Sequence, residues 1–247
     1  MFSKIVKDIF LGSFMKLGVL FSGGKDSVYA AYLAKRMGHE LACAIVIKSE
    51  NKDSYMFHTP SIEEAERQVG VMGIPLLVHG TKGEKEEELK DLADAIKIGK
   101  DKYGIEGVVT GALHSEYQAS RIGKICEELG LESINPLWHK EEISYLKELI
   151  DNNFEVIITG VAAYPLDGSW LGRKIDKKFI EDAVILKEKY KIHPAGEGGE
   201  FETFVLNCPL FSHGLKVKSF KDSSAGEHSW RRELNLEESK VGSVRSS

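Results

Sequence analysis

The segment that most constrains this chain is the sequence SGGKDS at residues 22–27, which stands between an apolar run at 15–21 and a helix-like run at 28–36. A buried strand, a glycine turn and a helix start, in that order, bring unpaired backbone N–H groups and the positive end of the helix dipole together. The glycines let a phosphate approach the backbone, the two serines offer hydroxyls and Lys25 supplies a mobile cation. The spacing is not that of a Walker A loop, because Asp26 follows Lys25. The segment therefore predicts a phosphate site, with Mg²⁺ or protein cations beside Asp26.

The first half of the chain alternates strand-like and helix-like segments. Strands are expected at 41–47, 75–79 and 107–110, and helices at 84–103 and around 122–129. Repeated strand–helix units give right-handed crossovers and a parallel sheet, with the ligand beyond the carboxyl ends of the strands. We therefore predict a Rossmann-like, parallel-sheet α/β nucleotide-binding domain over residues 15–135; the family resemblance given below implies that it is of the adenine nucleotide α-hydrolase type. Its loops at 22–27, 48–60 and 111–114 should surround one nucleotide.

A second, smaller α/β domain is predicted over residues 136–236, beginning after Asn135-Pro136. Its expected elements are helices at 141–152 and 179–191, and strands at 154–160, 201–206 and 215–220. We expect residues 1–14 to be an extension without function and residues 237–247 to be a flexible tail.

Composition excludes several classes of protein. A net charge of −5 over 247 residues argues against an extended nucleic-acid surface. The chain has neither an apolar run of membrane-spanning length nor a secretion signal. Its three cysteines are an odd number without metal-binding spacing, so we expect buried, reduced thiols and a cytoplasmic location.

Two further segments are chemical candidates, and each has a structural alternative. In residues 111–121, Gln118 and Arg121 share one helical face, where Arg121 could reach a phosphate or carboxylate; the alternative is a capped helix with an exposed salt bridge. In residues 167–173, Trp170 stands among glycines and charges. That pattern fits the wall of a binding site and the edge of a core equally well.

The glycine-rich segment GEGGEFET, at residues 196–203, carries three carboxylates, those of Glu197, Glu200 and Glu202. They should repel one another unless a cation, an amine or an ammonium ion lies among them. The alternative is a glycine turn that only stabilises the fold.

Residues 22–27 resemble the pyrophosphate loop of the ATP pyrophosphatases. Taken with SYMFH at 54–58, WLGR at 170–173 and GEGGEFET at 196–203, the chain from about residue 15 to residue 211 resembles the diphthine–ammonia ligases. The resemblance implies that ATP adenylates the carboxylate of diphthine on translation elongation factor 2 and releases pyrophosphate. Ammonium then supplies the amide nitrogen and AMP leaves. Neither a membrane nor a nucleic acid is an expected partner, and a homodimer is left open.

The resemblance and the residue chemistry together assign roles to the candidate residues. Those expected to act in catalysis are Lys25, Asp26, Glu197, Glu200 and Glu202, with Mg²⁺ on Asp26. Those expected to hold ATP are Ser22, Gly23, Gly24, Lys25, Asp26, Ser27, Ile47, Gly111 and Ala112. Those expected on the acceptor side are Tyr55, His58, Tyr117, Gln118, Arg121, Asp167, Trp170, Gly172, Arg173, Gly198, Gly199 and Thr203.

Two other functions compete with this interpretation. The first is an adenylating enzyme for another acceptor, such as a tRNA base; the acidic balance and the lack of a cysteine pair for sulfur transfer weigh against it. The second is a module that senses ATP or AMP without turnover. The intact Lys25 and Asp26 weigh against a sensor.

Overall fold

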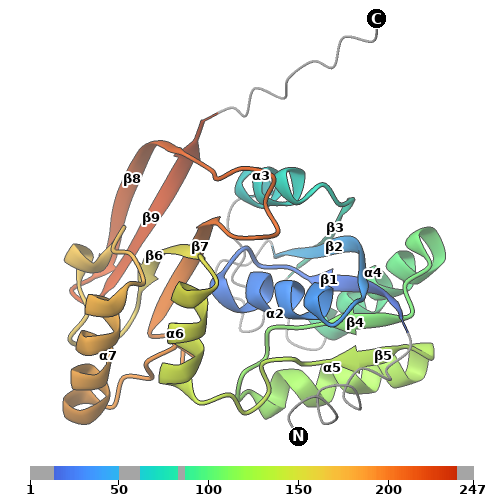
Figure 1. The fold of residues 1–247 in the computed structure, drawn as a ribbon, viewed down its shortest axis with the longest axis horizontal. Helices are drawn as coiled ribbons and strands as arrows, with labels where there is room; N and C mark the ends of the chain where they lie inside the picture. Colours follow the sequence, from blue (N-terminus) through green and yellow to red (C-terminus); the bar gives the residue numbers. More distant parts are fainter. Residues whose placement is uncertain (1–13, 50–61, 83–86, 238–247) are drawn as a thin grey trace, which may run out of the picture.

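The computed structural model describes residues 14–49, 62–82 and 87–237, and two β-sheets form its framework (Figure 1). The first sheet is parallel throughout, with the strand order β3-β2-β1-β4-β5. Its strands are β1 (Lys16–Leu20), β2 (Glu40–Ser49), β3 (Leu76–Thr81), β4 (Gly107–Val109) and β5 (Glu132–Ile134). The strand order reverses at β1, so the crevice between the carboxyl ends of β1 and β4 is the position where such sheets bind ligands. The predicted Rossmann-like parallel sheet is confirmed.

Helices cover both faces of this sheet, as the uninterrupted apolar strands require. The helices are α2 (Lys25–Arg36), α3 (Ile62–Met72), α4 (Glu87–Tyr103) and α5 (Glu116–Leu129). Side chains of α4 and α5, among them Ile96 and Ile122, pack with Ile45 and Val108 on one face. Side chains of α2 and α3 pack on the other face, where Val28 joins Val46.

The second sheet is antiparallel, with the order β7-β6-β9-β8. Its strands are β6 (Glu155–Val161), β7 (Phe201–Asn207), β8 (Val217–Gly226) and β9 (Ser229–Leu236), and it is accompanied by α6 (Glu142–Asp151), α7 (Lys177–Tyr190) and the short 3₁₀ helix η1 (Gly168–Trp170). Strand β7 lies beside α2 (Figure 1). One buried cluster runs from Leu17 and Val28 to Phe179 and Phe204, so the two sheets share a hydrophobic core.

The end of the second sheet differs from the prediction. The strand expected at 215–220 extends over Val217–Gly226, and its partner β9 was not predicted at all. Strand β8 is exposed along nearly its whole length, and β9 carries Arg231, Arg232 and Glu233 in succession. Strand β8 has no buried face, and the core-facing side of β9, with Trp230, Leu234 and Leu236, is interrupted by Arg232, so apolar alternation marks neither strand clearly in the sequence.

The cysteine prediction is confirmed: Cys43, Cys126 and Cys208 are free and buried. Burial raises the pKa of each thiol to about 11, which keeps them unreactive. Among the described helices, none combines the length and the apolar character needed to cross a membrane.

Candidate functional site

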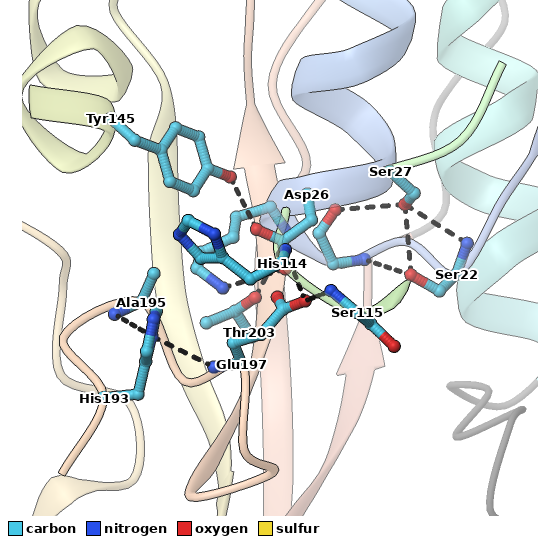
Figure 2. A network of polar contacts seen from close by, with 12 residues as sticks. Ser22, Asp26, Ser27, His114, Ser115, Tyr145, His193, Ala195, Glu197 and Thr203 are labelled. Atoms are coloured by element: carbon cyan, nitrogen blue, oxygen red, sulfur yellow. Dashed lines mark hydrogen bonds and ion pairs between the residues drawn. The ribbon is translucent and has the colours of Figure 1, made fainter. Parts of the chain in front are cut away.

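The loop at residues 22–27 follows β1 and enters α2, as expected for a phosphate loop. Gly23 has a positive φ of 75°, and Gly24 takes the N-cap position of α2 in an extended conformation. The Ser27 hydroxyl donates to the Gly24 carbonyl at 3.1 Å and accepts from the Ser22 backbone N–H at 3.2 Å (Figure 2). The side chain of Ser27 is therefore part of the loop's own framework, whereas that of Ser22 is exposed.

Strand β7 of the second sheet holds this loop from the other side. The Lys25 backbone N–H donates to Thr203 Oγ1 at 3.1 Å, and the Val205 N–H donates to the Gly23 carbonyl at 3.2 Å. Gln68 of α3, which is fully buried, donates from Nε2 to the carbonyls of both Gly23 and Val205, at 2.9 and 2.8 Å. The segment GEGGEFET, which contains Thr203, is thus joined directly to the phosphate loop. Sequence reasoning missed Gln68 because a glutamine in an amphipathic helix has no distinguishing pattern.

Lys25 is not the mobile cation that we expected. Its side chain is only 3% exposed, and Nζ forms an ion pair with Asp26 Oδ2 at 2.9 Å and lies 5.5 Å from the centre of the Phe201 ring. The other Asp26 oxygen accepts from the Tyr145 hydroxyl at 2.7 Å. Burial, with the nearby Asp26 carboxylate, raises the pKa of Tyr145 well above its ordinary value, so this hydroxyl stays protonated as a donor. Asp26 is therefore paired with Lys25 and hydrogen-bonded by Tyr145, yet its side chain remains 33% exposed.

Gly111 follows β4 and packs against the start of α2. A Cβ atom at this position would lie 2.5 Å from the Asp26 carbonyl carbon and 2.7 Å from the Ser27 nitrogen, which is closer than packed atoms approach. The neighbouring Ala112 is buried, and its N–H donates to Thr110 Oγ1 at 3.2 Å. The loop after β4 therefore lies directly against the backbone at the start of α2, which follows β1 on the other side of the crevice.

The first turns of α5 contain the predicted residues Tyr117, Gln118 and Arg121. Ser115 caps the helix by accepting from the Gln118 N–H at 3.4 Å. The Arg121 guanidinium lies 3.4 Å from the centre of the Tyr117 ring. This stacking takes the place of the exposed salt bridge in our structural alternative, and Arg121 Nη1 also donates to the Tyr117 carbonyl at 3.4 Å.

The three carboxylates of GEGGEFET each have a different protein partner. Glu197 Oε1 accepts from the backbone N–H groups of His114 and Ser115, both at 3.0 Å (Figure 2). Glu200 Oε1 accepts from the His193 N–H at 2.9 Å, whereas Glu202 lies 3.7 Å from Arg231. These partners offset the mutual repulsion without a shared cation.

The glycines of this segment have conformational roles. Gly196 and Gly199 have positive φ angles of 69° and 80°, and a Cβ on Gly198 would lie 2.8 Å from Glu200. Gly196 also packs against Phe201, where a Cβ would lie 3.0 Å from the ring.

The segment 167–173 forms an edge of the core. Trp170 contacts Phe179 with ring centres 6.0 Å apart, and the Arg173 guanidinium lies 4.3 Å from the Trp170 ring and 2.5 Å from Asp182. Asp167 caps η1 by accepting from the Ser169 N–H at 2.9 Å. Gly172 has a φ of 78° and lies against Arg232. These contacts match the core-edge alternative for Trp170, since Phe179 and Phe201 lie between it and Lys25.

One of the remaining predicted positions lies in β2. Ile47 is 3% exposed in β2, next to β1 in the sheet. Tyr55 and His58 lie outside the described residues.

The structure also brings together three side chains that the sequence did not mark as a group. His114 follows β4, Glu142 begins α6 and His193 follows α7. Each offers a ring nitrogen or a carboxylate oxygen, and these atoms lie within 4.8 Å of one another. Figure 2 shows the backbone N–H of His114 donating to Glu197, on the acceptor side of the loop.

One hollow in the described part of the chain lies elsewhere. It measures about 760 Å³, is open to solvent and is lined by Met15, Glu106 and Leu131 among others. These residues precede β1, β4 and β5, so the hollow lies at the amino ends of the strands, away from the phosphate loop.

Comparison with known proteins gives matches to both parts of the chain. The model of the diphthamide synthase N-terminal domain matches residues 15–133, and that of the C-terminal domain matches residues 141–239. The diphthine–ammonia ligases of Bos taurus and Homo sapiens are each 34% identical over 225 residues, covering 83% of this chain and 84% of theirs. A solved structure described as a predicted subunit of tRNA methyltransferase from Methanocaldococcus jannaschii has a TM-score of 0.40 at 21% identity, and the match covers 79% of this chain and 98% of that one.

Proposed function

The chain belongs to the diphthamide synthase family, and on that premise we propose that it is a diphthine–ammonia ligase that amidates diphthine on translation elongation factor 2, with ATP and ammonium as co-substrates. One observation supports the proposal most directly: the hydrogen bond from the Lys25 N–H to Thr203 Oγ1 joins the phosphate loop to the segment GEGGEFET. An adenylating enzyme needs its ATP loop and its acceptor side in one site, because the carboxylate must attack the α-phosphate.

The chemistry explains why ATP is needed. A carboxylate at neutral pH resists attack by an amine, and adenylation replaces its poor leaving group with AMP. The carboxylate oxygen attacks the α-phosphorus and pyrophosphate leaves; ammonia then attacks the acyl carbon, and the bond to AMP breaks. We assign pyrophosphate to the N-terminal turn of α2, where backbone N–H groups and the helix dipole favour an anion. Lys25, buried beside Asp26, offsets the charge that develops as pyrophosphate departs.

Mg²⁺ is part of the proposal, and the residues present fit it. Asp26 is a partly exposed carboxylate at the mouth of a phosphate loop, and each of its oxygens has one protein partner and further lone pairs. Such a carboxylate, with phosphate oxygens and water, is the donor set that Mg²⁺ takes in nucleotide sites. When bound, the ion would neutralise charge on the phosphates.

The acceptor side comprises the residues that surround the loop on the β7 side. We assign diphthine to the region of Glu197, Glu200 and Glu202, with Tyr117, Gln118 and Arg121 on the facing helix. The trimethylammonium group of diphthine is a cation that carboxylates and aromatic rings bind favourably. We also propose a cytoplasmic location, which suits three free cysteines.

The test is a product assay with Mg-ATP, ammonium and elongation factor 2 that carries diphthine. We expect AMP and pyrophosphate to form only when the acceptor is present, and the modified histidine to change from acid to amide by mass. Binding of ATP without its consumption, with all components present, would instead favour a nucleotide sensor. Consumption of ATP that is indifferent to elongation factor 2 would favour another acceptor.

A further inference from the structure

The cluster of His114, Glu142 and His193 has no role in the function described so far. It lies beside the proposed site in which ammonia attacks the acyl adenylate, which we call the acyl-transfer site. His193 Nε2 lies 3.4 Å from Glu142 Oε1, and the rings of His114 and His193 have centres 5.8 Å apart. The second Glu142 oxygen is 3.1 Å from Lys187 Nζ. Two imidazoles and one carboxylate could bind a transition metal or transfer protons. The hydrogen bonds around each ring distinguish these two roles.

The protonation of His193 argues against a metal. Its Nδ1 accepts the Ala195 N–H at 3.2 Å (Figure 2). A neutral imidazole with Nδ1 as acceptor carries its proton on Nε2, and Nε2 is the atom that faces Glu142. Burial lowers the pKa of His193, which keeps the ring neutral. The Nε2–H of His193 therefore faces Glu142 Oε1 at 3.4 Å, and Nε2 has no lone pair on that side for a metal.

Glu142 keeps its charge in this setting. Although burial opposes ionisation, the hydrogen bond and charge of Lys187 lower the pKa of Glu142. The carboxylate therefore accepts a hydrogen bond from Lys187 on one oxygen and has the His193 ring 3.4 Å from the other, and it keeps further lone pairs.

His114 is the member of the cluster with spare hydrogen-bonding capacity. Its Nε2 is buried and has no hydrogen-bond partner in the described part of the chain. Its backbone is fixed, because its N–H donates to Glu197 Oε1 at 3.0 Å. Gly111 and Ala112, which we assign to the nucleotide, precede it by three and two residues. A titratable ring thus stands at the edge of the acyl-transfer site.

The carboxylates that the sequence suggested as bases are less suited to this task. Glu197 Oε1 already accepts two backbone N–H groups, so this oxygen is occupied by the protein. Glu200 Oε1 accepts the backbone N–H of His193, and its buried Oε2 has no partner among the described residues, but Glu200 is not part of the cluster of His114, Glu142 and His193. Glu202 lies near Arg231. His114 Nε2, in contrast, has no hydrogen-bond partner in the described part of the chain, and histidine is the side chain that most often serves as a general base.

We propose that His114 and Glu142 form the ammonium site, that the Glu142 carboxylate binds the cation and that His114 Nε2 takes its first proton, with His193 as a positioning residue. The inference rests on the proposed function. Ammonium and the acyl adenylate give the amide, AMP and two protons. The first proton moves to His114 and frees the nitrogen lone pair, which forms the C–N bond. The electron pair of the C–O bond leaves on AMP, and the second proton then passes from the nitrogen to solvent water.

Hydroxylamine separates this step from the rest of the reaction. It is uncharged at neutral pH and attacks acyl adenylates without losing a proton first, so it needs neither the Glu142 charge nor the His114 base. We would measure three rates with His114→Gln: ATP–pyrophosphate exchange with the acceptor present, hydroxamate formation and amide formation. We expect amide formation to fall by about 10²-fold, the usual contribution of a general base, while exchange and hydroxamate formation stay close to wild type.

Two further variants complete the test. Glu142→Gln should raise the KM for ammonium and leave the KM for ATP unchanged, which keeps the inference testable if His114→Gln does not fold. His139→Gln is the matched control, because this exposed histidine has its ring centre 5.8 Å from that of His114 and is not part of the cluster; it should behave as wild type. Equal losses of amide and hydroxamate in His114→Gln, or unchanged kinetics in both variants, would overturn the inference. A wild-type enzyme that forms neither product would instead refute the proposed function.

Discussion

Thr203 Oγ1 accepts a hydrogen bond from the Lys25 backbone N–H at 3.1 Å, across 178 residues of sequence. The interaction gives one of the unpaired amides of the α2 N-terminus a partner from the other sheet. It makes the position of the phosphate loop depend on β7. A change on the acceptor side of the site should therefore alter ATP binding.

Thr203→Val tests this dependence, since valine keeps the shape and removes the hydroxyl. We expect a loss of about 1 kcal/mol in the free energy of unfolding, because a partly buried N–H loses its partner, and a higher KM for ATP in the exchange assay. Thr203→Ser keeps the hydroxyl and should restore ATP binding. Equal KM values for the valine and serine variants would mean that β7 does not position the loop.

Gly111→Ala should damage the site by crowding it. The added Cβ would lie 2.5 Å from the Asp26 carbonyl carbon, and backbone atoms cannot yield as a flexible side chain can. We expect a cost of about 1–3 kcal/mol and a marked loss of ATP–pyrophosphate exchange. Gly123→Ala is the control: this helical glycine has open space around its Cβ position, so the change should stabilise the protein by about 0.5–1 kcal/mol without affecting exchange. Unfolding by denaturant and exchange rates would be measured for both variants.

The parallel sheet and its loops could be predicted because local patterns determine them. Apolar runs between glycine turns marked β1, β2 and β4, and the SGGKDS segment marked the start of α2. The antiparallel hairpin β8–β9 could not be predicted, because β8 is exposed and polar and because Arg232 interrupts the apolar side of β9 that packs against the core.

The site was predicted less completely than the fold, for a related reason. Loop glycines and carboxylates are visible in the sequence, but their partners are set by contacts between distant elements. Gln68 bridges the Gly23 and Val205 carbonyls, and Tyr145 reaches Asp26 from α6. Both residues fit ordinary helical patterns. Lys25 was expected to be mobile because its burial depends on Phe201 and on Asp26, a geometry that only the folded chain defines.

Asp182 provides a pH-dependent prediction. The hydrogen bond from Arg173, with support from Lys178, lowers the pKa of this carboxyl in the folded protein. A lowered folded pKa means that the contribution to stability is complete above the unfolded value of about 3.9 and is lost as the pH falls through the folded value. Asp182→Asn should therefore cost up to about 1 kcal/mol at pH 7, since the side chain is 26% exposed and solvent screens the pair.

The pH dependence of that cost is the informative measurement. The difference in unfolding free energy between the wild type and Asp182→Asn should shrink toward zero well below pH 4, because both side chains are then neutral. Glu181→Gln, at an exposed position on the same helix, should show little difference at either pH. A cost for Asp182→Asn that is the same at pH 7 and at low pH would exclude an electrostatic origin.

Tyr145→Phe isolates the contribution of the hydroxyl that holds Asp26. The hydroxyl is the donor at 2.7 Å to Asp26 Oδ1, and its removal lets the carboxylate turn toward Lys25 or solvent. We expect ATP–pyrophosphate exchange to fall by about tenfold, equivalent to about 1.4 kcal/mol of lost transition-state stabilisation. Tyr32→Phe is the matched control. The Tyr32 hydroxyl also joins α2 to the end of α6, where it donates to Asn152 at 2.8 Å, but it does not reach the phosphate loop. Each change removes one hydroxyl from the contact between α2 and the α6 region, so we expect the two variants to lose similar stability. Loss of exchange in Tyr145→Phe alone would then show that the orientation of Asp26, and not helix packing, limits adenylation.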